Sequence, residues 1–138
     1  LLYLSLYLKQ NQAAYYRNLS AIRTEGDWIG WLRFFLVGVA GIADDATRTA
    51  RGLYSQVAED RRKLLATPGA TVTAIQLFEQ LPAHPVVTMP LVTRLLATSK
   101  PTAGKAIELL ITAGILAEIG ERKRDRLYRY QNYLNLLD

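Results

Sequence analysis

A proline-free run from Asp27 to Thr67 is the feature that most constrains the fold of this chain. Apolar residues recur through it at spacings of three and four, which places them on one side of an α-helix. At about 1.5 Å per residue, such a helix is roughly 50 Å long or more. The apolar positions are Trp28, Trp31, Leu32, Phe35, Leu36, Val39, Ile42, Ala43, Ala46, Ala50, Leu53, Val57 and Leu64. The pattern predicts one long amphipathic helix, capped by Asp27, with Trp28, Trp31 and Phe35 in its packed face.

The residues on either side of this helix predict two domains. Residues 2–24 read as helix, with a break near Gln10 to Gln12 and a stop at Gly26. Residues 66–70 contain a Pro-Gly pair, which ends a helix and marks a linker. We therefore expect a mainly α protein. Its N-terminal helical bundle spans residues 1–67, and a second domain spans residues 70–138.

The second domain has the pattern of a winged helix-turn-helix with a small β-hairpin. A first helix is expected over residues 73–81, and a second begins at the N-cap Thr88. After a turn, Ser99 caps a third helix that ends before Gly114. Residues 115–119 and 127–130 read as strands, because aromatic and aliphatic residues are mixed in them. A short terminal helix is expected over residues 133–137.

In a helix-turn-helix, the outward face of the later helix enters the major groove of DNA. Basic and hydroxyl side chains on that face and on the hairpin tip are therefore candidates for DNA contacts. Glu108 and Leu109 are also expected on the outward face, and they favour a protein partner instead. The tip is equally well read as a solvated charged loop. The candidate DNA-binding residues are Lys100, Thr102, Lys105, Thr112, Arg122, Lys123, Arg124 and Arg126.

Composition argues against several kinds of chemistry. The chain of 138 residues has no cysteine and one histidine, so thiolate and zinc sites are not expected. Its net charge of +5 mildly favours an acidic partner. His84 has no nucleophile signature beside it, and no phosphate-binding loop occurs. We assign no catalytic, cofactor-binding or metal-binding residue, and we expect a cytoplasmic protein with no membrane span.

The N-terminal half resembles the part of Fic-family proteins that follows their catalytic motif. The resemblance rests on residues 2–8, on Tyr15-Tyr16, and on Gly26-Asp27-Trp28 with the run from Trp31 to Leu36. Residues 99–103 and 114–116, with Tyr133-Leu134, are similar to the winged-helix domain that many bacterial members carry at the C-terminus. The resemblance implies that this chain is the C-terminal part of a longer protein.

Fic-family proteins transfer AMP from ATP, with Mg²⁺, to a hydroxyl group of a target protein through an HPFx(D/E)GNGR signature. Here His84-Pro85 is followed by Val86-Val87, so the resemblance implies no catalytic residue in this chain. ATP and Mg²⁺ are expected only in an upstream Fic core. Two functions remain open: a regulatory module that binds double-stranded DNA, or an interaction module that regulates the Fic core. The long helix could also pair two copies into a homodimer.

Overall fold

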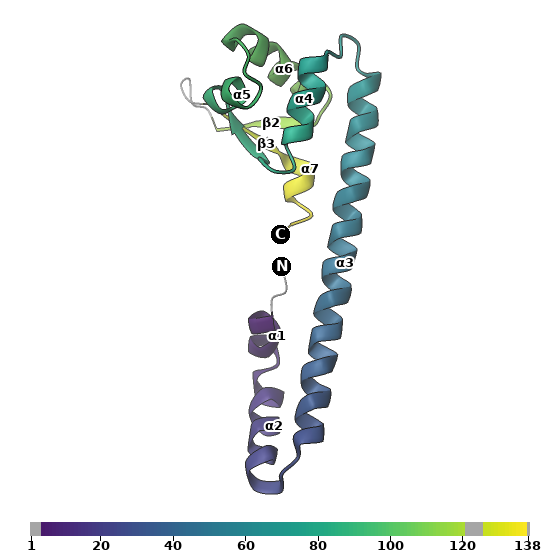
Figure 1. Cartoon of the computed structure of the whole chain (residues 1–138), viewed down its shortest axis with the longest axis vertical. Coiled ribbons are helices and arrows are strands. Elements are labelled where there is room, and N and C mark those ends of the chain that lie inside the picture. Colours follow the sequence, from purple (N-terminus) through teal and green to yellow (C-terminus); the bar gives the residue numbers. More distant parts are fainter. Residues whose placement is uncertain (1–3, 121–125, 138) are drawn as a thin grey trace. The chain divides into compact units, whose positions relative to one another are not determined.

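The fold is mainly helical and includes a small antiparallel sheet (Figure 1). The computed structural model describes residues 4–120 and 126–137. Two compact units divide the chain, Leu1–Arg51 and Gly52–Asp138. The division falls inside α3, which runs without interruption over Trp28–Ala66. The prediction of one long helix from residue 27 onward is confirmed.

The first unit contains α1 (Leu4–Gln10), α2 (Gln12–Glu25) and the start of α3. Asn11 separates α1 from α2, and its side-chain amide donates to the Tyr7 carbonyl oxygen at 2.9 Å. Gly26 ends α2 in the left-handed region at φ +69°, which glycine adopts without a steric cost. Asp27 Oδ1 then accepts the Gly30 N–H at 2.9 Å and caps α3. The predicted break, stop and cap are confirmed.

Aromatic side chains hold α1 and α2 against α3. The Tyr15 ring lies 5.6 Å from the Trp31 ring, and the Tyr7 ring lies 5.4 Å from the Phe34 ring. The Tyr7 hydroxyl also donates to the Phe34 carbonyl oxygen at 3.3 Å. Trp28 is 61% exposed, so its assignment to the packed face was wrong. The two short helices run alongside the first part of α3 (Figure 1) and contact it through Trp31 and Phe34.

Two glycines three positions apart on α3 give a matched test of this packing. A methyl group at Gly38 would collide with the Tyr7 ring, whereas one at Gly41 would meet open space. We expect Gly38→Ala to lower the free energy of unfolding by about 1–3 kcal/mol, and Gly41→Ala to raise it by about 0.5–1 kcal/mol. Tryptophan fluorescence during urea unfolding reports on this unit, because both tryptophans lie in it. Equal effects at the two positions would contradict the packing of α1 on α3.

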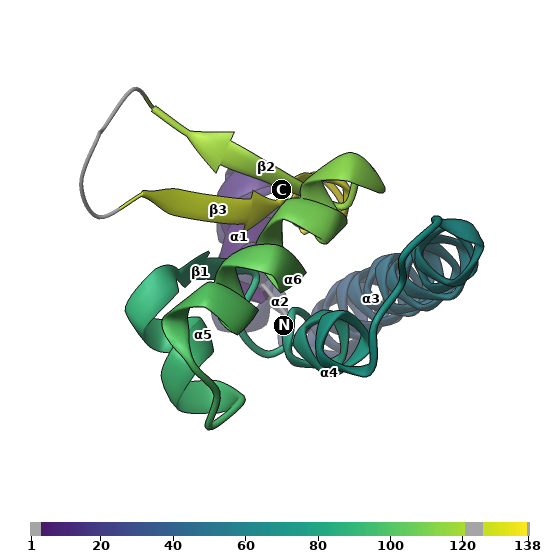
Figure 2. The same cartoon turned by 90° about the horizontal axis from the view of Figure 1, so that it is seen from above.

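The second unit combines the end of α3 with four helices and three strands of the described chain. They are α4 (Val72–Gln80), β1 (Val86–Thr88), α5 (Met89–Leu95), α6 (Lys100–Thr112), β2 (Leu116–Ile119), β3 (Leu127–Tyr130) and α7 (Gln131–Leu134). The strands pair antiparallel in the order β1-β3-β2. Helix α6 packs on α4, α5 and β2, and lies between the other helices and the hairpin (Figure 2).

Most of these elements match the sequence-based expectations. The two hairpin strands and the helix after Ser99 are confirmed. The terminal helix lies earlier than expected, at residues 131–134, and stacks Tyr133 on Tyr130 with ring centroids 5.3 Å apart. Strand β1 was not predicted. Its central residue Val87 is buried and pairs with Tyr128 of β3.

The core of the second unit includes residues from the end of α3. Leu64 is fully buried together with Leu77, Phe78, Ile107 and Leu110. The Pro-Gly turn after Ala66 therefore leads from α3 into α4, which joins the same core. A salt bridge of 2.5 Å between Arg61 and Glu79 links the two helices at the surface.

One carboxylate, Asp60, is fully buried in this core. Its Oδ2 accepts hydrogen bonds from the Tyr130 hydroxyl and from Gln56 Nε2, both at 2.8 Å, and its Oδ1 accepts one from Lys63 Nζ at 3.2 Å. Burial, and then the hydrogen bond to Asp60, raise the pKa of the Tyr130 phenol well above its usual value. The phenol therefore stays protonated and remains the donor that ties β3 to α3.

Candidate nucleic-acid interface

Helices α5 and α6 each begin with a hydroxyl cap and a proline. Thr88 Oγ1 accepts the Leu91 N–H at 3.3 Å at the start of α5. Ser99 Oγ accepts the Thr102 N–H at 3.4 Å at the start of α6. Pro101 occupies the first turn of α6, where no backbone N–H is needed. Both predicted caps are confirmed.

The turn between the two helices is tight and contains one strained residue. Ala97 lies in the left-handed region at φ +47°, which costs a residue with a Cβ roughly 1–2 kcal/mol. The Thr98 N–H donates back to the Thr93 carbonyl oxygen at 3.1 Å. The turn therefore ends α5 within a few residues and starts α6 in a new direction.

Helix α6 has one buried face and one exposed face. The buried side chains are Ala103, Ala106, Ile107 and Leu110. The predicted outward residues Lys100, Thr102, Lys105, Glu108 and Thr112 are all exposed. Leu109 is partly buried and packs against the core, so its expected exposure was wrong. It lies at the boundary between the two faces and is only partly exposed.

The side chains proposed to contact DNA differ in how they are engaged. Lys100 and Lys105 are exposed and form no ion pair with any described residue. Thr102 Oγ1 shares a 2.9 Å hydrogen bond with Ser99 Oγ, and Thr112 Oγ1 donates to the Glu108 carbonyl oxygen at 3.0 Å. The two hydroxyl groups are thus partly committed to their own helix.

On the hairpin, the structure places only part of the predicted basic tip. Arg126 immediately precedes β3 and forms an ion pair of 3.3 Å with Glu118 of β2. This pair offsets its charge. Arg122, Lys123 and Arg124 lie outside the described residues.

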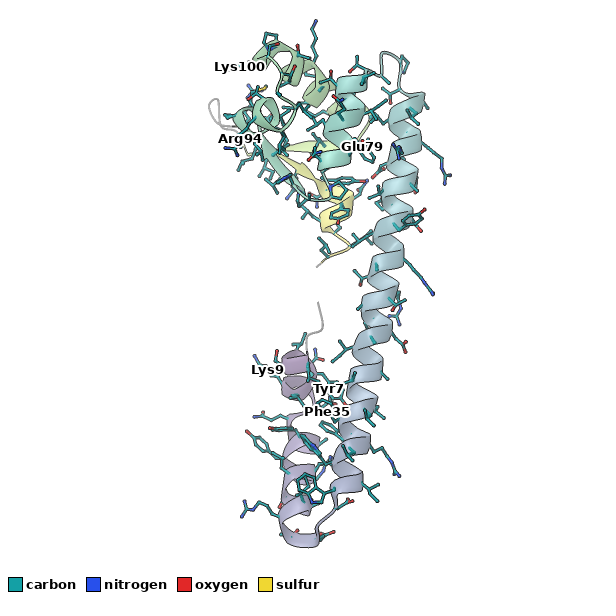
Figure 3. All side chains as sticks on the ribbon, in the orientation of Figure 1. Tyr7, Lys9, Phe35, Glu79, Arg94 and Lys100 are labelled. Atoms are coloured by element: carbon teal, nitrogen blue, oxygen red, sulfur yellow. The ribbon has the colours of Figure 1, made fainter. Side chains whose placement is uncertain are left out.

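Two further exposed cations lie on helix α5 and strand β3, and sequence reasoning did not select them. Arg94 lies in the last turn of α5, and Figure 3 shows it together with Lys100. Arg129 lies on β3 between Tyr128 and Tyr130, which are both buried. The alternation along β3 was the available signal, because neighbouring side chains in a strand point to opposite faces.

A groove of about 340 Å³ lies between α6 and the hairpin. Met89, Ile107 and Tyr128 supply apolar surface, and Gly104 adds no side chain. Glu108, Glu118 and Arg126 contribute the charged groups. Arg126 offsets the charge of Glu118, so Glu108 is the one charged group of the lining without an ion pair among the described residues. An apolar lining with one unpaired carboxylate suits a cationic or apolar partner better than a phosphate.

The described part of the chain contains no group of three metal-ligating side chains. Nor does any helix within residues 4–120 and 126–137 have the length and apolar character needed to cross a membrane. A comparison with models of known protein families finds no match, and a search among curated proteins also finds none.

Proposed function

We propose that the second unit is a winged helix-turn-helix that binds double-stranded DNA in a regulatory role. The observation that carries this proposal is the exposed face of α6, where Lys100, Thr102 and Lys105 follow a tight turn after α5. The order helix, strand, helix, helix, strand, strand from α4 to β3 supports it. Such a unit presents its later helix to the major groove and uses cations to position it on phosphates.

We further propose that the chain is the C-terminal part of a bacterial, cytoplasmic Fic-family protein. The run from Gly26 to Leu36 and the early Leu2–Leu8 and Tyr15-Tyr16 segments support this parentage. AMP transfer would then belong to an upstream core that binds ATP and Mg²⁺. The residues present here do not fit that reaction, because His84-Pro85 lacks the rest of the signature. No catalytic step is assigned to this chain.

Duplex binding at graded salt concentration tests the DNA proposal. If about four cations meet phosphates, the logarithm of the association constant should fall against log salt with a slope near −3.6. Lys105→Ala should weaken binding by about 1–3 kcal/mol if it reads a base, or reduce the slope by about 1 if it meets a phosphate. Fluorescence anisotropy with labelled duplexes measures both quantities.

Arg62→Ala is the matched control, because it also removes an exposed cation from this unit but lies on α3. It should leave the duplex affinity within about twofold of the parent chain. Absence of duplex binding at low salt, or an equal loss in the control, would overturn the proposal.

The groove beside α6 favours a second candidate, an interaction module that regulates the Fic core. Ile111 is 38% exposed at the groove, and the Glu108 carboxylate would repel a phosphate. Glu108→Gln separates the two candidates. It should strengthen duplex binding if α6 faces DNA, and weaken capture of a basic partner if the groove holds protein.

A further inference from the structure

The first half of α3 carries an apolar surface that nothing in its own unit covers. Ile29, Leu32 and Leu36 are 71%, 52% and 60% exposed. Gly38 is the only buried residue among residues 4–51. Soluble monomers rarely leave apolar residues gathered in one large exposed patch. This face therefore has the character of an interface.

These residues form one continuous stripe along the helix. The three residues are three and four positions apart, and exposed small residues continue the same spacing, so the stripe extends over about five helical turns. The outer stripe consists of Ile29, Leu32, Leu36, Ala40, Ala43 and Thr47. Large side chains lie at one end of it and small ones at the other. An antiparallel copy would set the large end of each helix against the small end of its partner, which allows close packing.

We propose that a second copy of this chain covers the outer stripe, with the two α3 helices antiparallel about a twofold axis near residue 38. In such an isologous pair, the outer stripe of one copy contacts the outer stripe of the other. Leu36 of each copy then meets Ala40 of the other, and Ile29 meets Thr47. The inference concerns the first unit alone and does not depend on DNA binding by the second.

Charge at the edge of the stripe selects the antiparallel arrangement. Arg33 and Asp44 are exposed, and neither forms an ion pair with any described residue, whereas neighbouring Asp45 pairs with Arg48 at 3.1 Å. They lie about three turns apart, so both stand on the same edge of the stripe. In an antiparallel pair, like edges face each other, which brings Arg33 of one copy beside Asp44 of the other. A parallel pair would set both charges against the opposite, apolar edge near Trp28 and Val39.

Sedimentation equilibrium of the full chain tests the proposal. The parent chain should dimerise, and Leu36→Lys should raise the dissociation constant at least about 100-fold, because one leucine is lost from each side. Leu6→Lys is the matched control. Leu6 is 47% exposed in the same unit, but it lies on α1, which packs on the side of α3 that carries Phe34, so the dimer should persist. Circular dichroism should show that both variants remain helical.

A charge exchange tests the orientation. Arg33→Asp alone and Asp44→Arg alone should each weaken the dimer on the order of tenfold, and the double variant should recover the parent affinity. A strict monomer at high concentration would overturn the proposal and leave the stripe to a different protein. A dimer that survives Leu36→Lys would show that the outer stripe is not the interface. A double variant that does not recover the parent affinity would overturn the antiparallel arrangement.

Discussion

Replacing Asp60 by alanine is expected to lower the free energy of unfolding of the second unit by about 3–5 kcal/mol. The Asp60 carboxylate is fully buried and accepts hydrogen bonds from Tyr130, Gln56 and Lys63. Its removal leaves the buried Tyr130 hydroxyl without its acceptor, and an unpaired buried donor retains its full desolvation cost. The loss should appear in the hydrogen exchange of α6 amides, which report on this unit.

Glu59 provides the control for this substitution. It is the adjacent carboxylate on α3, and it forms an exposed ion pair of 3.1 Å with Lys63. Because exposed pairs contribute little, Glu59→Ala should change stability by about 0.5 kcal/mol or less. Tyr130→Phe should be costly by itself and should add little to Asp60→Ala, since the two residues share one interaction. Equal effects of Asp60→Ala and Glu59→Ala would show that the buried hydrogen bonds do not form.

Ile107→Ala is expected to destabilise the second unit by about 2–5 kcal/mol, whereas Ile111→Ala should cost less than about 1 kcal/mol. The two isoleucines lie one turn apart on α6, so helix propensity changes equally in both variants. Ile107 is 1% exposed and lies in the core with Phe78 and Leu110, while Ile111 is 38% exposed. The difference between the two losses of stability therefore reports how much more of Ile107 than of Ile111 is buried in the core.

Urea unfolding followed by far-ultraviolet circular dichroism measures this pair of variants, and tryptophan fluorescence serves as an internal reference. Both tryptophans belong to the first unit, so its unfolding signal should not shift in either variant. A larger loss at Ile111 than at Ile107 would mean that α6 is rotated about its axis. That rotation would also withdraw Lys105 from the proposed DNA-binding face.

Elements governed by neighbouring residues could be predicted well from the sequence. The break at Asn11, the left-handed Gly26 and the caps Asp27, Thr88 and Ser99 each depend on contacts within about four positions. The hairpin strands also followed from local composition. For the candidate site, the buried and exposed faces of α6 were largely predictable, because a helix repeats every 3.6 residues.

Apart from the shifted terminal helix, the errors concern contacts between different elements. Strand β1 has three residues, too few for a periodic pattern, and exists because β3 supplies its partners. Trp28 and Leu109 fit the expected faces by spacing, but Trp28 is 61% exposed and Leu109 packs against the core.

The sequence alone determined where the capped helices begin, because caps, prolines and glycines act on the backbone within one turn. Only the tertiary structure decided which sides of those helices are covered. Asp60 shows this most clearly: it reads as one charge in an exposed run, yet Tyr130, seventy residues later, makes it the buried acceptor of the second unit. Burial depends on which surfaces meet, and that information is spread over the whole chain.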